Sequence, residues 1–69
     1  MNAATLCVEM PNGINRQDAV TEALRLMDLL SVQVRFVFNE FDVHVYSAES
    51  GLVFDKAINV YIPFIEWIR

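Results

Sequence analysis

The sequence predicts a single small α+β domain with the element order β-α-β-β-α, in which two helices cover one face of a three-stranded sheet. Strand-like alternation in residues 5–10 and 32–46, and helical periodicity in residues 16–30, predict this fold class. The chain has 69 residues, so residues 1–69 form one domain. A hydrophobic share of 55% with 20% charged residues excludes intrinsic disorder.

The first strand is expected over residues 5–10, where an apolar face alternates with a mixed one. Residues 11–13, Pro-Asn-Gly, then break the chain with turn residues. Asn15 suits a helix N-cap, and Asp18 lies in the first turn, where the helix dipole favours an acid. The apolar residues of the helix 16–30 follow helical spacing and form its core face: Ala19, Val20, Ala23, Leu24, Leu26, Met27 and Leu30.

A β-hairpin is the strongest local prediction. Residues 32–38 and 41–46 both alternate between apolar and other side chains around Asn39-Glu40. Asn39 suits the first turn position, although Glu40 stands where Gly is usual. A two-residue turn places six apolar residues on one face, in the pairs Phe38–Phe41, Phe36–Val43 and Val34–Val45. The pattern does not decide which hairpin strand the first strand joins.

The segment 52–69 is ambiguous. Its Ile, Val, Phe and Tyr content favours a strand. Its polar residues are spaced four, seven and three apart, as on one helical stripe: Asp55, Asn59, Glu66 and Arg69. A strand would also place Lys56 on an apolar face. We therefore expect a helix that is kinked or broken at Pro63, with two separate pieces or a strand as alternatives.

The chain offers few groups for catalysis. His44 and Cys7 are its one histidine and one cysteine, too few for a zinc site within a protomer. A Cys/His pair would need the first strand beside the third. No phosphate loop or paired-acid motif is present. The sequence therefore predicts no enzyme, no metal and no cofactor.

Charge and hydropathy restrict partners and location. A net charge of −4 and five scattered basic residues argue against nucleic-acid binding. The uncharged run 57–65 is shorter than the roughly 20 residues of a membrane span. Residues 1–4 have no basic segment before an apolar one, so we expect no signal peptide. A lone Cys7 suits a reducing environment, which predicts a cytoplasmic protein.

Two surfaces are candidate contact sites. The outer face of the hairpin presents Arg35, His44 and Tyr46, either as a recognition surface or as an ordinary solvated face. Used for nucleic acid, this face would make the protein a small regulator, which is the alternative function.

The second candidate surface lies in the final segment. In so short a chain, the free energy gained by burying apolar surface nearly equals the entropic cost of ordering the residues. The surplus of apolar side chains therefore favours association over a well-packed monomer. A final helix would be apolar over more than half its circumference. Its expected dimer or partner interface is Tyr61, Ile62, Phe64, Ile65 and Trp67, with closure of the core as the alternative for Trp67.

The stretch 34–45, VRFVFNEFDVHV, followed by the expected helix with its aromatic residues, resembles small accessory proteins of bacteriophages. The resemblance covers residues 16–69 and departs from the pattern at Glu40 and Pro63. It implies a protein that binds and blocks a host component such as a bacterial defence protein, as anti-CRISPR proteins do. It carries over no functional residue. The sequence thus predicts a non-enzymatic interaction protein in the host cytoplasm that binds itself, a host protein, or both.

Overall fold

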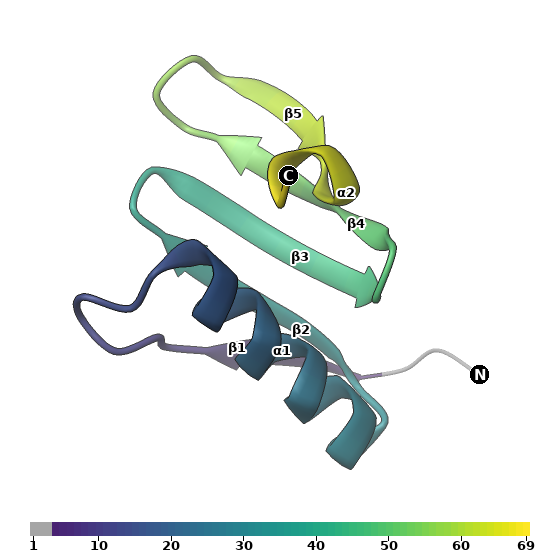
Figure 1. The fold of residues 1–69 in the computed structure, drawn as a ribbon. Helices are drawn as coiled ribbons and strands as arrows, with labels where there is room; N and C mark the ends of the chain where they lie inside the picture. Colours follow the sequence, from purple (N-terminus) through teal and green to yellow (C-terminus); the bar gives the residue numbers. More distant parts are fainter. Residues whose placement is uncertain (1–3) are drawn as a thin grey trace.

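The structure, a computed structural model that describes residues 4–69, contains one five-stranded mixed sheet and two helices (Figure 1). The strand order is β1-β2-β3-β4-β5; β1 is parallel to β2, and all other neighbours are antiparallel. The elements are β1 (Thr5–Val8), α1 (Arg16–Leu30), β2 (Gln33–Phe38), β3 (Phe41–Ser47), β4 (Ser50–Asp55), β5 (Val60–Pro63) and α2 (Phe64–Trp67). The expectation that no signal peptide is present was based on residues 1–4, and residues 1–3 of these lie outside the described range.

The predicted three-stranded β-α-β-β-α fold is wrong, because two further strands replace most of the expected last helix. The placement of both helices on one face is nevertheless observed. Helix α1 packs on β2 and β3, and α2 packs on β3, β4 and β5. Figure 1 shows the two helices on the same side of the sheet.

The β1-α1-β2 unit has the predicted element types, but β1 ends at Val8 rather than at residue 10, and Leu30, expected in the core, is 50% exposed. The side chain of Asn15 accepts a hydrogen bond from the Asp18 N–H at 2.8 Å, which caps α1. Ser31, at φ 54°, ends the helix in the left-handed conformation. The Gln33 N–H donates to the Ala4 carbonyl at 2.9 Å, where β2 begins to pair with the parallel strand β1. The first strand therefore lies beside the first hairpin strand.

The β2–β3 hairpin has the predicted register, with Phe38 opposite Phe41, and Phe36 opposite Val43. Asn39 takes φ 53° at the turn, a conformation that Asn tolerates better than most residues. This hairpin supplies the centre of the sheet.

The segment 50–63 forms a second hairpin, and the predicted helix is wrong there. Asp55 begins its turn, and its Oδ1 accepts a hydrogen bond from the Ala57 N–H at 3.0 Å. Asn59 ends the turn at φ 58°. The supposed helical stripe thus contained the last residue of β4 and the last residue of the turn, and Lys56 lies in the turn rather than in a strand. Pro63 ends the edge strand β5, where Pro is tolerated.

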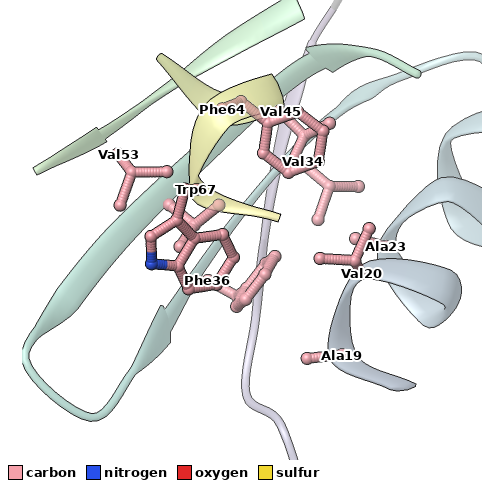
Figure 2. Close-up of a cluster of buried hydrophobic side chains, with 10 residues drawn as sticks. Ala19, Val20, Ala23, Val34, Phe36, Val45, Val53, Phe64 and Trp67 are labelled. Atoms are coloured by element: carbon pink, nitrogen blue, oxygen red, sulfur yellow. The ribbon is translucent and has the colours of Figure 1, made fainter. Parts of the chain in front are cut away.

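The core lies between the sheet and the two helices (Figure 2). Its buried residues, within the described range 4–69, are Ala19, Val20, Ala23, Val34, Phe36, Val43, Val45, Val53, Phe64 and Trp67. Helix α2 has one turn, yet it inserts the largest two side chains of its segment into this core. The Trp67 ring meets Phe38 and Phe41 edge-on, with centroids 6.0 and 5.5 Å apart.

Arg16 joins the two helices. Its guanidinium donates to the Trp67 carbonyl at 2.9 Å and lies 4.5 Å from the centre of the Trp67 ring. A cation in the first turn of α1 opposes the helix dipole. The contacts of Arg16 with Trp67 instead hold the start of α1 against α2.

Gly51 permits close packing on β4. A Cβ there would collide with the His44 carbonyl oxygen and lie 3.0 Å from Cβ of Phe64. Glycine thus lets β3 and α2 approach the same point of the sheet.

Candidate functional site: the open face of the sheet

Within residues 4–69, both helices lie on one face of the sheet and leave the other face without a helix (Figure 1). Side chains alternate along a strand, so the neighbours of the core residues project from this second face. We call it the open face; its residues are Thr5, Cys7, Gln33, Arg35, Val37, Asp42, His44, Tyr46, Leu52, Phe54, Tyr61 and Pro63. It contains the three residues predicted for an outer sheet face.

The strand register arranges the centre of the open face in two rows. One row crosses all five strands and contains Cys7, Arg35, His44, Leu52 and Pro63. The next row crosses four strands and contains Val37, Asp42, Phe54 and Tyr61. Polar groups therefore lie mainly on β2 and β3, and an apolar and aromatic area lies on β4 and β5.

An ion pair joins the two rows. Nε of Arg35 donates to Oδ1 of Asp42 at 2.9 Å, and Nη2 donates to Oδ2. This bidentate contact lowers the pKa of the Asp42 carboxyl and raises the pKa of Arg35. Both groups stay charged near neutral pH, and together they leave no net charge at the centre of the face.

His44 lies beside this pair. Its Nε2 is 3.3 Å from Oε1 of Gln33, and its ring packs against Tyr46 with centroids 4.6 Å apart. Arg35 and His44 are cross-strand neighbours, as predicted. The structure therefore brings Arg35, His44 and Tyr46 together on one surface.

Two hollows flank the ion pair. The larger, about 470 Å³, is lined by Arg35, Asp42, His44, Tyr46, Leu52, Phe54 and Tyr61. The smaller, about 400 Å³, is lined by Cys7, Val8, Glu9, Arg35, Phe36, Val37 and Asp42. Arg35 and Asp42 line both hollows and so form a ridge between them. The open face thus has relief that a partner can match.

Two residues of the larger hollow, Leu52 and Phe54, were not predicted as contact residues, whereas Tyr61 was predicted as part of a helical interface rather than of the sheet. Leu52 is 42% exposed and Tyr61 is 66% exposed. The rings of Phe54 and Tyr61 lie 4.8 Å apart across neighbouring strands. Alternation within 52–55 and 60–62 was the available signal. It was obscured because both faces of this hairpin carry apolar residues.

The five residues predicted as an interface do not form one surface. Phe64 is fully buried and Trp67 is 4% exposed, so both belong to the core of the chain itself. Ile62 and Ile65 are half-buried, and Tyr61 alone of the five is exposed. Trp67 occupies the position that the sequence analysis gave as its alternative, closing the core. A contact role for Tyr61 stays a prediction.

The positions of Cys7 and His44 decide whether the two side chains can act as a catalytic pair. Cys7 and His44 lie in one row with Arg35 between them, on strands β1 and β3. Two strand spacings amount to about 10 Å, too far for a nucleophile and its base. Within residues 4–69, no three His, Cys, Asp or Glu side chains are grouped to hold a metal ion. Over the same range, no helix has the length and apolar character needed to cross a membrane.

No protein-family model, curated protein or solved structure matches the chain.

Proposed function

We propose that this protein is a non-enzymatic interaction protein that binds another protein through the open face of its sheet. The observation that carries the proposal is a large exposed apolar area on a face without helices. Leu52 and Tyr61, on β4 and β5, are both more than 40% exposed on it and lie beside half-buried Phe54. Contiguous apolar patches with polar groups among them are typical of protein contact sites.

The charge of the open face favours a protein over a nucleic acid. Its one arginine is engaged with Asp42, and the chain as a whole carries −4. Binding to a phosphate backbone requires unpaired basic groups, which this face does not offer. Tyrosine and arginine are residues that protein interfaces favour.

Site-specific photo-crosslinking tests the proposal. A benzophenone amino acid replaces Tyr61 on the open face or, as matched control, Leu29 on α1; both native side chains are 66% exposed. The chain is irradiated in the cells that express it, and adducts are identified by mass spectrometry. We expect one defined protein adduct from position 61, none from position 29, and loss of the adduct on Leu52→Arg.

Equal labelling from both positions, or no adduct from position 61, would overturn the proposal. Binding of a labelled single-stranded oligonucleotide at low salt that Arg35→Ala weakens would favour the nucleic-acid alternative instead. A block on a bacterial defence component and a cytoplasmic location stay predictions from the sequence.

A further inference from the structure

We infer that the partner of the open face is a second copy of this chain, so that two sheets pack face to face with the helices outside. This inference rests on the proposed function and names its partner. Sheets that pack in this way lie about 10 Å apart, with interdigitating side chains. The dimer would have four layers: helices, sheet, sheet and helices.

The relief of the open face suits a copy of itself. The Arg35–Asp42 ridge separates two hollows of comparable size, about 470 and 400 Å³. A two-fold axis beside the ridge places the ridge of each copy in the larger hollow of the other. Every contact of residue i with residue j then occurs twice, as an isologous interface requires. No second, differently shaped surface is needed.

The charges on the open face permit this arrangement. Arg35 and Asp42 cancel one another within each copy, so two faces meet without net repulsion. The hydroxyls of Tyr46 and Tyr61, which border the same hollow, can accept hydrogen bonds from the remaining guanidinium donors of Arg35. The pair therefore keeps polar partners when water leaves.

The dimensions of the molecule leave room for at most one standard interface on the open face. The two longest dimensions of the molecule are 33 and 26 Å, which limit a flat face to about 860 Å². A standard interface covers about 800 Å² on each partner. The open face spans all five strands, so a sheet-to-sheet dimer uses nearly the whole of it. Burial of Leu52, Phe54 and Tyr61 would add the apolar area that the small core lacks.

Sedimentation velocity over a range of concentrations tests the dimer. Wild-type protein is compared with Tyr61→Arg and Leu52→Arg, and Leu29→Arg is the matched control, since it adds the same charge at an exposed apolar position on α1. We expect wild type and Leu29→Arg to dimerise. In the two open-face variants the dissociation constant should rise by about thirtyfold or more, as for a contact hot spot. Fluorescence of Trp67 in the core verifies that each variant is folded.

The outcomes separate the two proposals. A wild-type chain that stays monomeric at all concentrations overturns the self-association; if position 61 still crosslinks to a different protein, the proposed function survives. A dimer that persists in both Tyr61→Arg and Leu52→Arg places the contact elsewhere and overturns the inference. A dimer lost in Leu29→Arg as well does the same.

Discussion

The two faces of the sheet are built from alternate residues of the same strands, yet they differ in composition and in exposure. On the covered face, Val34, Val43 and Val53 are fully buried beneath the helices. On the open face, Arg35, Asp42 and His44 alternate with them along the same strands, and large apolar residues stay exposed. The side chains of the covered face are packed within the chain, whereas Leu52 and Tyr61 on the open face keep 42% and 66% of their surface exposed. The difference identifies where the chain stabilises itself and where it has surface left for contact.

The largest expected effect on stability comes from replacing a phenylalanine on the covered side, which can be compared with replacing a phenylalanine on the open face. Phe64→Ala removes a fully buried ring from the covered side and should lower the free energy of unfolding by about 3–5 kcal/mol. Phe54→Ala, at a half-buried position on the open face, should cost only about 1 kcal/mol in the monomeric protein. Urea denaturation followed by Trp67 fluorescence measures both. Equal losses would show that the open face is packed as tightly as the core.

Gly51→Ala probes how closely the covered side is packed. Its Cβ meets the His44 backbone and Cβ of Phe64, neither of which is a flexible side-chain end. We expect a loss of about 1–3 kcal/mol in the free energy of unfolding. Ser50→Ala, at the exposed neighbouring position, is the control and should change stability by less than about 0.5 kcal/mol. A neutral Gly51→Ala would contradict the close approach of β3 and α2.

The salt dependence of dimerisation tests the contact at the open face in the wild-type protein. Each copy carries −4, and the ion pair leaves the open face itself neutral. Added salt screens the repulsion between two acidic copies within a Debye length of about 10 Å at 0.1 M. Dimerisation of the wild type should therefore strengthen several-fold between low and moderate salt. Weaker dimerisation at higher salt would indicate a contact held by opposite charges instead.

The smallest effect concerns the ion pair at the centre of the open face. Arg35 lowers the pKa of Asp42 in the folded chain below its ordinary value of 3.8, so this pair contributes its full stability at pH values above 3.8. That stability is lost as the pH falls through the folded pKa. Because the pair is partly exposed, we expect less than about 1 kcal/mol. Chemical denaturation at pH 7 and pH 2.5 measures it; Asp42→Asn should reduce the difference between them, and an unchanged difference would assign the acid sensitivity to other groups.

Much of the fold followed from local patterns. The structure contains the predicted Asn15 cap, the helix over 16–30 and the predicted strand pairs around Asn39. Each of these features depends on residues near one another in sequence. The grouping of Arg35, His44 and Tyr46 followed from the same hairpin register. Leu52, Phe54 and Tyr61 did not, because the second hairpin was assigned as a helix.

The sequence by itself determined α1, its cap, and the alternation that separates the two faces of β2 and β3, since these depend on local backbone geometry and side-chain period. Only the tertiary structure decided the state of residues 50–69. Apolar residues on both faces of that segment satisfy helical and strand spacing alike, so periodicity cannot choose between them. Pairing of β4 with the free edge of β3 chose the strand, and it thereby placed Phe64 and Trp67 in the core and Leu52, Phe54 and Tyr61 on the open face.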